Sequence, residues 1–302
     1  MLRAVRRATL IVNPRASAVT EADLEAVRRA LAAAAELRVF RTEGRGHATE
    51  LAREAAADSD AVFVYAGDGG ANEVLNGLNG DVPVGFVPGG GTSVLPRALG
   101  LPRDAGQAAA EVASALADGR TRRISLGRVN GRLFAFAAGV GLDAELVRRV
   151  DERGRSLTGR RAGDLAFGLA AAQLFAHRRG TLEPALEIAG HGRAAFLLVA
   201  NGRPYTYAGR VALDVAPRAS FDLGLDFVAP VRVRPADIPR LLGYALRGRG
   251  QVEAADVIYG HDLDRIEVSC DGPMPVQADG EDLGDATEVV FEAVRDAVTV
   301  LA

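Results

Sequence analysis

The sequence is short of several residue types, and each shortage narrows the class of protein it encodes. It has no tryptophan, a single cysteine (Cys270) and no lysine, so its 36 basic residues are all arginine. One cysteine excludes an internal disulfide and a cysteine-based metal cluster, which fits a reducing compartment. The absence of lysine excludes a Walker A phosphate loop, in which a lysine reaches the β- and γ-phosphates. Any nucleotide must therefore be bound by backbone amides, arginine and a metal ion.

Long hydrophobic runs are also absent. No run of about 18 apolar residues occurs, and the basic start at 1–7 leads into ATLIVNP without the apolar core of a signal peptide. With 48% hydrophobic residues, 25% charged residues and a net charge of −3, the composition is typical of a soluble globular protein. A length of 302 residues favours two domains. We therefore expect a cytoplasmic two-domain protein with no nucleic-acid partner.

The most informative stretch is VFVYAGDGGANEVLNGL, residues 62–78. A buried-strand pattern breaks into glycines around Asp68 and resumes as a helix pattern from Ala71. Glycines at such a junction let backbone N–H groups approach a ligand, and the helix N-terminus adds partial positive charge. A carboxylate there would repel phosphate unless a divalent cation lay between them. The stretch indicates a nucleotide with a metal ion, although a tight βα turn with an N-cap aspartate fits equally well.

The first hundred residues alternate strand and helix patterns, which predicts a parallel, doubly wound α/β sheet with ligands at the carboxyl ends of its strands. Three strand ends carry suitable loops, at 13–15, 67–70 and 88–92, and we expect them to converge on one edge. Strands are predicted at 9–13, 37–42, 61–66 and 82–87, and helices at 21–35, 47–57, 72–78 and 105–117.

The pattern changes near residue 121, where we place the domain boundary. Short alternating segments follow, and Asn130-Gly131 is a hairpin signal. The second part is therefore predicted to be mostly antiparallel β structure, interrupted by helices near 143–150, 162–177 and 234–246.

A local charge bias lies at 148–179, where eight arginines stand against Asp151, Glu152 and Asp164. The apolar segment LAFGLAAAQLFA, 165–176, lies within it. A basic segment beside an apolar helix can bind an anionic membrane surface. A core helix flanked by a solvated loop gives the same pattern.

Several motifs in register resemble the diacylglycerol kinase catalytic-domain family of bacterial lipid kinases, which are related to sphingosine kinases and more distantly to NAD kinases. The resemblance covers nearly the whole chain. The motifs that carry it are Asn13-Pro14, Thr42 with Gly46-His47-Ala48, AGDGGANEV at 66–74, VPGGGTSVLPRALGLP at 87–102, ISLGRVNGRLFAFAAGVGLDAE at 124–145, APRASFDLGLDFV at 216–228 and Asp279-Gly280-Glu281.

The resemblance implies a nucleotide-binding α/β domain at 1–121 with 293–302 and a β-sandwich lipid-binding domain at 122–292, with the active site in the cleft between them. Residues 297–302 would be the last strand, returning to the first domain. ATP and Mg²⁺ would be the cofactors and a lipid alcohol the acceptor. The expected cell location is cytoplasmic with peripheral contact to an anionic membrane, and a homodimer is left open.

The resemblance also assigns roles to individual residues. Asp279 would be the general base for the acceptor hydroxyl, with Glu281 beside it, and Asp68 and Asp279 would hold the metal. The predicted catalytic residues are Asp279, Glu281 and Asp68, and the predicted nucleotide-binding residues are Asn13, Thr42, Gly67, Asp68, Gly69, Gly70, Glu73, Gly90, Gly91, Thr92 and Arg97. Without the resemblance, Asp279-Gly280 is a plain β-turn, Glu73 a favourable charge at a helix start and Arg97 a surface residue.

The chain departs from the family pattern at the expected active site. Gly70 replaces a threonine, Ser93-Val94 replace an asparagine and an aspartate, and Ser125 replaces an acidic residue. Two hypotheses of different class follow: an active ATP-dependent lipid kinase, including a kinase of a lipid-like specialised metabolite, or a weak or inactive homologue that binds nucleotide or lipid as a partner. A soluble small-molecule kinase resembling NAD kinase is a third. The acceptor alcohol cannot be identified from sequence pattern.

Overall fold

A computed structural model describes residues 6–78, 81–157 and 180–302, without the side chains of 150–157. The chain divides into two compact units, one made of residues 1–124 and 296–302 and the other of residues 125–295. The strands β5 (Thr121–Val129) and β16 (Glu281–Leu301) each begin in one unit and end in the other.

The first unit contains a parallel sheet in the order β16-β4-β3-β1-β2. Its strands are β1 (Arg7–Val12), β2 (Glu36–Arg41), β3 (Ala61–Ala66) and β4 (Val84–Pro88), joined by the end of β16. Every residue of β3 and β4 is buried, as expected for central strands covered on both faces. The end of β16 pairs with β4 through Val300 and Val84, which confirms the predicted return of the last strand.

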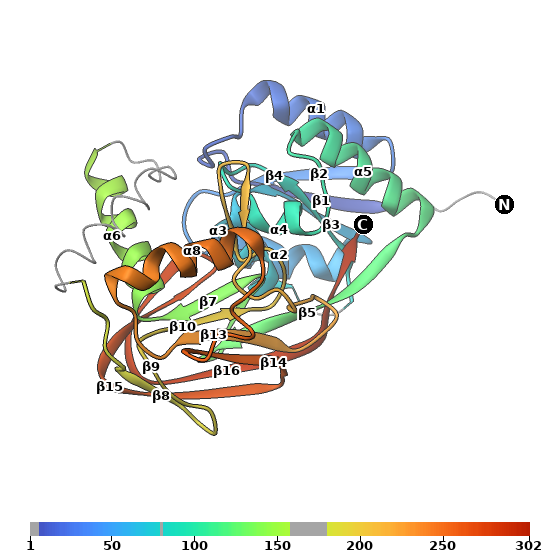
Figure 1. Ribbon diagram of the computed structural model, residues 1–302. Helices are drawn as coiled ribbons and strands as arrows, with labels where there is room; N and C mark the ends of the chain where they lie inside the picture. Colours follow the sequence, from blue (N-terminus) through green and yellow to red (C-terminus); the bar gives the residue numbers. More distant parts are fainter. Residues whose placement is uncertain (1–5, 79–80, 158–179) are drawn as a thin grey trace. The chain divides into compact units, whose positions relative to one another are not determined.

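Helices cover both faces of this sheet, with α1 and α5 on one face and α2 and α3 on the other (Figure 1). The helices are α1 (Glu21–Ala32), α2 (His47–Asp58), α3 (Asp68–Gly77), α4 (Val94–Ala98) and α5 (Ala105–Asp118). The α5 helix shows why these segments begin and end where they do. Asp104 caps its first turn by accepting the N–H of Gln107, and Gly119 ends it in the left-handed conformation, with φ of 71°.

The start of α3 differs from the prediction, which began this helix at residue 72. The helix begins at Asp68, so Asp68, Gly69 and Gly70 form its first turn, and Gly67 is its N-cap. Glycine is a poor helix former, but the packing of α3 on β3 overrides this preference here. Part of the predicted glycine loop is therefore helical.

The second unit is antiparallel and β-rich, as predicted, and its main strand order is β14-β13-β10-β7-β15-β16. Asn130 and Gly131 have φ of 45° and 91° and connect β5 to β6, which confirms the hairpin. The other strands are β6 (Arg132–Phe134), β7 (Ala137–Val140), β8 (Leu186–Ile188), β9 (Gly192–Ala194), β10 (Leu197–Ala200), β11 (Thr206–Ala208), β12 (Val211–Leu213), β13 (Leu225–Pro230), β14 (Val257–Leu263) and β15 (Arg265–Ala278).

The core of the second unit depends on the long strand β15. Its first half pairs with β8 and its second half with β7, and its register with β16 shifts between Ser269 and Met274. Such a shift bends a strand, so that one strand can contribute to two layers. The core cluster of this unit includes Phe134, Phe227 and Phe291, all fully buried.

The helices described in the second unit are α6 (Leu142–Leu157) and α8 (Ile238–Arg247). The α6 helix continues beyond the predicted 143–150. Where one helix over 234–246 was predicted, the 3₁₀ helix η1 (Pro235–Asp237) precedes α8. The helix predicted at 162–177 lies outside the described residues. Among the helices that the structure describes, none is long and apolar enough to cross a bilayer.

Candidate functional site

The carboxyl ends of the four parallel strands are tied side by side in the first unit. The N–H of Thr42 donates to the carbonyl of Val12 at 2.8 Å, and the N–H of Asn13 donates to the carbonyl of Tyr65 at 3.0 Å. The N–H of Gly89 donates to the carbonyl of Ala66 at 2.8 Å. These bonds join the strand ends in the order β2, β1, β3, β4, so the predicted convergence of the loops on one edge is confirmed.

Two glycine segments touch at this edge. A Cβ added to Gly90 would lie 2.9 Å from the Cα of Gly67, and one added to Gly67 would lie 3.5 Å from the Cα of Gly90. Real Cβ atoms essentially never approach a backbone atom within 3.0 Å. Only glycine at position 90 therefore permits this backbone contact, which brings the segment after β4 against the start of α3.

Asp68 links the same two segments through its side chain. Its Oδ1 accepts the N–H of Leu95, in the first turn of α4, at 3.1 Å. Ser93, with φ of 46°, closes the second glycine segment by bonding both the N–H and the carbonyl of Gly90. The carboxylate that the sequence assigns to metal binding therefore also fixes the position of α4.

The other predicted nucleotide-binding residues of the second glycine segment lie close to these. The N–H of Gly91 donates to Ser17 Oγ at 3.0 Å, and the guanidinium of Arg97 donates to the carbonyl of Thr92 at 3.2 Å. On the other side of the edge, the Oδ1 of Asn13 accepts the N–H of Arg15. These side chains brace the loops that carry them.

Glu73 holds a neighbouring loop. Its two carboxylate oxygens accept the N–H of Gly46 at 2.9 Å and the N–H of Ala48 at 3.2 Å. Both amides belong to the start of α2, where N–H groups lack helical partners. The predicted role of Glu73 in orienting a loop fits this geometry: Glu73 fixes the segment that follows Thr42.

The departure at Gly70 is explained by its neighbour Ala66. A Cβ on Gly70 would lie 2.6 Å from the Cβ of Ala66. The motif that AGDGGANEV at 66–74 resembles reads G-G-D-G-T-x-N-E-V, so Ala66 stands at its first glycine and Gly70 at its threonine. The methyl group of Ala66 therefore fills the space that a side chain at position 70 would need.

The other departures lie in the interior of each unit. Val94 is 2% exposed in the first unit, and Ser125 is 1% exposed in the second. The carbonyl of Ser125 accepts a hydrogen bond from Asn201 Nδ2 at 2.8 Å. A carboxylate at either position would need a partner to offset the cost of its burial.

In the second unit, Asp279 lies in a cradle of backbone amides. It is 2% exposed and has φ of 48°. Its carboxylate accepts the N–H groups of Ala135, Phe136 and Ala137 at 2.6, 3.0 and 3.2 Å. Hydrogen bonds to a charged acceptor are stronger than neutral ones, so these amides hold the side chain in one orientation.

Glu281, two residues further along the chain, is 7% exposed. Its Oε2 pairs with the guanidinium of Arg132 at 2.7 Å. The Asp279-Gly280-Glu281 turn therefore carries two buried carboxylates with different partners, one bound by backbone amides and one by an arginine.

A buried polar network that the sequence analysis missed supports this turn. Asp143, at the start of α6, accepts hydrogen bonds from the hydroxyl of Tyr205 at 2.6 Å and from Gln277 Nε2 at 2.5 Å. Gln277 Oε1 accepts the N–H of Gly280 at 2.9 Å. Burial raises the pKa of Asp143 above its ordinary value and the pKa of Tyr205 well above its own. The only signals in the sequence were Asp143, two residues after the GVG at 139–141, and Gln277, two residues before Asp279.

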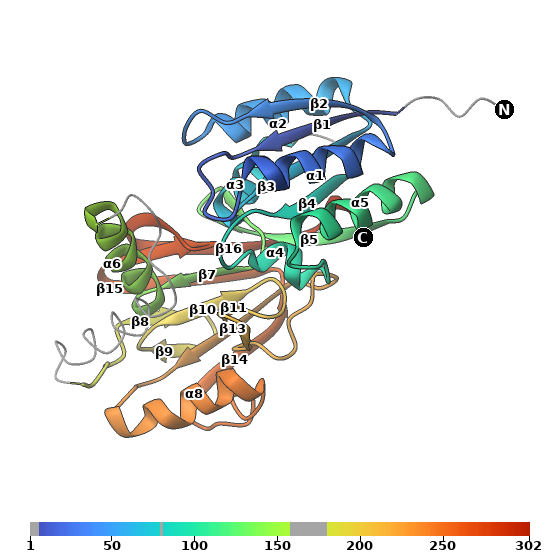
Figure 2. The ribbon, with the colours of Figure 1, turned by 90° about the horizontal axis from the view of Figure 1, so that it is seen from above.

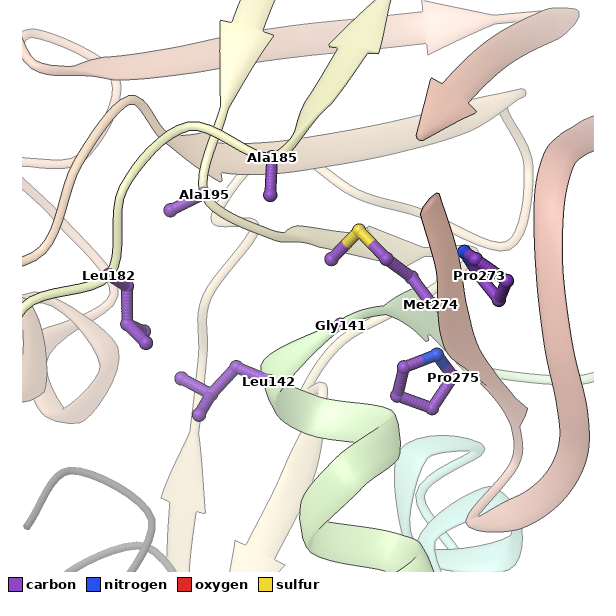
Figure 3. Close-up of a pocket in the computed structure, with 8 residues that line it drawn as sticks. All are labelled: Gly141, Leu142, Leu182, Ala185, Ala195, Pro273, Met274 and Pro275. Carbon is purple, nitrogen blue, oxygen red and sulfur yellow. The ribbon is translucent and has the colours of Figure 1, made fainter. Parts of the chain in front are cut away.

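An apolar cavity of about 120 Å³ lies at the start of α6, where Gly141 and Leu142 line it (Figure 3). The side chains of Leu142, Leu182 and Met274 point toward its centre. The remaining lining residues are Gly141, Ala185, Ala195, Pro273 and Pro275. The cavity lies wholly in the second unit.

The described residues contain no cluster of three or more histidine, cysteine, aspartate or glutamate side chains that could hold a metal ion. The two predicted metal ligands, Asp68 and Asp279, belong to different units. Mg²⁺ is commonly held by one or two protein carboxylates together with phosphate oxygens and water, so a single carboxylate beside a phosphate-binding loop can suffice.

Comparison with known proteins gives the family. A model of the diacylglycerol kinase catalytic domain matches residues 7–129. The chain is 31% identical over 246 residues to a diacylglycerol kinase of Bacillus subtilis, covering 78% of this chain and 76% of that protein. The chain belongs to the diacylglycerol kinase catalytic-domain family. The resemblance stated from the sequence motifs is therefore confirmed.

A second relative and a solved structure cover still more of the chain. A Pseudomonas aeruginosa protein named "Probable lipid kinase YegS-like" is 31% identical over 271 residues, 87% of this chain and 85% of its own. The crystal structure of a diacylglycerol kinase from Bacillus anthracis superposes with a TM-score of 0.73 over 99% of this chain and 97% of that one, at 21% identity. The structural likeness shows the two-domain kinase fold, and family membership places the chain among the lipid kinases, which phosphorylate an alcohol.

Proposed function

We propose that this diacylglycerol kinase family member transfers the γ-phosphate of ATP, with Mg²⁺, to the hydroxyl of a lipid alcohol such as diacylglycerol. The observation that carries the proposal is the contact between Gly67 and Gly90, at the strand edge where α3 begins. Phosphoryl transfer requires mainly positioning and neutralisation of charge. Backbone amides and a helix N-terminus provide both without any lysine.

The residues of the first unit fit a nucleotide with Mg²⁺. Gly67, the N-cap of α3, has no side chain with which to bond the first amides of that helix, and helix N-termini favour phosphate oxygens. Asp68 would hold Mg²⁺, directly or through its water, while Arg97 and Thr92 brace the second glycine segment. Bound Mg²⁺ would offset the charge of the phosphates. Asn13 and Thr42, at the ends of β1 and β2, would line the nucleotide pocket.

In the second unit, the proposed lipid contacts are the apolar cavity beside Leu142 and the carboxylates at 279–281. The cavity would receive part of an acyl chain, because its lining is mostly hydrophobic. Asp279 would accept the proton of the attacking hydroxyl, and its cradle of three amides would keep its oxygens in place. Glu281, paired with Arg132, would be its charged neighbour.

Peripheral contact with an anionic membrane is part of the proposal, because a diacylglycerol resides in a bilayer. The basic segment that suggested this contact lies mostly outside the described residues. The two arginines of this segment whose side chains the structure describes are paired, Arg148 with Asp282 and Asp285 and Arg149 with Glu145. A homodimer and a cytoplasmic location also remain proposals.

The test is turnover of γ-labelled ATP with Mg²⁺ and dioleoylglycerol in mixed micelles, followed by the same assay with a lipid extract. We expect labelled lipid from the wild type, and strong loss of label in Asp68→Asn and Asp279→Asn variants that remain folded by circular dichroism. Asp271→Asn is the matched control, because Asp271 is an exposed carboxylate paired with Arg193. Labelled product at the wild-type rate in both test variants would overturn the assigned roles.

A second candidate function, a weak or inactive homologue that binds nucleotide or lipid as a partner, is favoured by Gly70, Val94 and Ser125. At these positions the chain has lost a hydroxyl and two carboxylates of the family pattern. This candidate predicts nucleotide binding, measured by calorimetry, without labelled lipid from any extract.

A further inference from the structure

The apolar face of the helix α8 is only partly covered by the rest of the second unit. Ile238 and Leu241 pack inward against a buried cluster that includes Phe196 and Val233. Leu242 and Leu246, four residues apart and therefore neighbours on one side of the helix, are 51% and 49% exposed. Part of the apolar face of α8 is therefore open to solvent.

The hairpin β11–β12 extends this exposed surface. The N–H of Asp214, directly after β12, donates to the carbonyl of Ala245 in α8 at 2.7 Å. Val211, in β12, is 51% exposed. Among the described residues, four large hydrophobic side chains are classed as exposed, and Val211, Leu242 and Leu246 are three of them. The fourth, Phe40, lies in the first unit.

Exposed arginines lie in and next to α8 along the chain. The segment 231–250 contains five arginines and a single acidic residue, Asp237. Arg232 pairs with Glu183, and Arg240 with Asp237 and Asp256. Arg234, Arg247 and Arg249 are exposed, and none of them forms an ion pair with the side chains that the structure describes. Glu253 is the exposed acid of the turn that follows. The surface is thus apolar with unneutralised positive charge.

The same helix lies over the apolar cavity. The cluster that receives Ile238 and Leu241 includes Leu182 and Ala195, and both of these side chains also line the cavity. Figure 2 shows α8 as the outermost element of the second unit, beyond β14. The inward side of α8 and the cavity proposed to receive an acyl chain therefore share Leu182 and Ala195.

We propose that α8 and the hairpin β11–β12 form a docking surface for an anionic lipid bilayer, with Leu242, Leu246 and Val211 in the interfacial region and Arg234, Arg247 and Arg249 at the lipid headgroups. An amphipathic helix with basic residues binds such interfaces through its apolar face and through attraction to anionic lipid. The exposed arginines favour a bilayer over a second copy of the chain, because two copies facing each other would bring like charges together. The role of this surface in catalysis rests on the proposed lipid substrate, but binding of the surface to a bilayer is tested without the kinase reaction.

The absence of tryptophan makes a direct test possible. Leu246→Trp places a single tryptophan on α8, and Phe40→Trp places one at the matched exposed position in the first unit. With vesicles of equal phosphatidylglycerol and phosphatidylcholine, and no ATP, we expect a blue shift of emission for Leu246→Trp and none for Phe40→Trp. Phosphatidylcholine vesicles alone should give no shift in either variant.

Charge variants test the same surface without changing the side chains that α8 packs inward. Arg247→Gln with Arg249→Gln should weaken sedimentation with the anionic vesicles about 30-fold, since each arginine near such a surface contributes about a factor of five. Arg53→Gln, an exposed arginine on α2, should leave sedimentation unchanged.

Vesicle binding with no shift at Leu246→Trp, or no vesicle binding at all, would overturn the proposal. A shift without vesicles that grows with protein concentration would also overturn it, in favour of a second copy. None of these results depends on whether ATP is consumed, so failure here is distinguishable from failure of the proposed kinase activity.

Discussion

Asp68 in the first unit and Asp279 in the second are both predicted to act at the site, yet their surroundings differ. Asp68 is partly exposed in the first turn of α3, and its Oδ1 accepts one amide of α4. Asp279 is 2% exposed and accepts three amides of one loop. In the first unit the glycine backbone provides the shape of the site. In the second unit, buried side chains provide it.

This difference predicts different responses to mutation. The site in the first unit depends on glycines without side chains, so a side chain added there should impair ligand binding while the rest of the unit stays folded. A site built from buried carboxylates depends on satisfied hydrogen bonds, so removal of a charge should cost stability as well as activity. The four predictions below separate these two kinds of site.

The largest effect is expected for Asp279→Asn. Asparagine offers one acceptor oxygen and a donating amide, so at least one of the N–H groups of Ala135, Phe136 and Ala137 would lose its partner. We expect a loss of about 3 kcal/mol in the free energy of unfolding, measured with urea. Asp271→Asn, at an exposed ion pair, should cost less than about 1 kcal/mol. Equal losses in both variants would contradict the role given to the amide cradle.

Gly90→Ala should act on function more than on folding. Its Cβ would lie 2.9 Å from the Cα of Gly67, so the two glycine segments must separate. A displacement of this size in a positioning loop lowers turnover on the order of 100-fold. Gly91→Ala is the matched control, because its Cβ would meet only Ser17 Oγ, at 3.7 Å. Gly90→Ala should bind nucleotide more weakly, measured by calorimetry, and turn over more slowly than Gly91→Ala. Similar behaviour of the pair would remove the main support for a phosphate cradle.

Gly70→Thr tests the compensation between positions 66 and 70. Alone, the new Cβ would lie 2.6 Å from the Cβ of Ala66, which should cost about 2 kcal/mol of stability through overpacking. In the double variant with Ala66→Gly, most of that loss should be recovered. A double-mutant cycle on thermal unfolding measures the coupling. Additive effects would show that the two positions are independent.

The smallest effect is expected for Asp143→Asn, and it should depend on pH. Burial raises the pKa of Asp143 in the folded state above its ordinary value of 3.8. The folded state therefore binds the proton more tightly, and stability from this group is present below pH 3.8 and lost as the pH rises through the raised pKa. Asparagine does not ionise but still accepts from Tyr205 and Gln277. Urea titrations at several pH values should show the wild type losing stability relative to Asp143→Asn as the pH rises, and parallel curves would contradict this.

Much of the first unit could be predicted because its signals are local. Strand and helix alternation from 8 to 100 gave the parallel sheet, and parallel strands bring their carboxyl ends to one edge. The start of α3 was predicted four residues too late, since glycine propensity argues against a helix that packing on β3 permits. The contact of Gly67 with Gly90 and the compensation of Gly70 by Ala66 depend on side-by-side strands, and no sequence pattern specifies such distances.

In the second unit the antiparallel character and the Asn130-Gly131 hairpin were predictable, whereas the network of Asp143, Tyr205 and Gln277 was not. Its members lie far apart in the chain and meet only because β7, β15 and the start of α6 pack together. The exposed leucines of α8 escaped prediction for a similar reason, since burial depends on which neighbours cover a face. The sequence by itself determined the family, the parallel and antiparallel halves and the glycine segments, because these follow from local spacing and motifs. Only the tertiary structure decided which carboxylates are bound by amides and which apolar side chains remain uncovered, because hydrogen-bond partners and burial arise from contacts between distant segments.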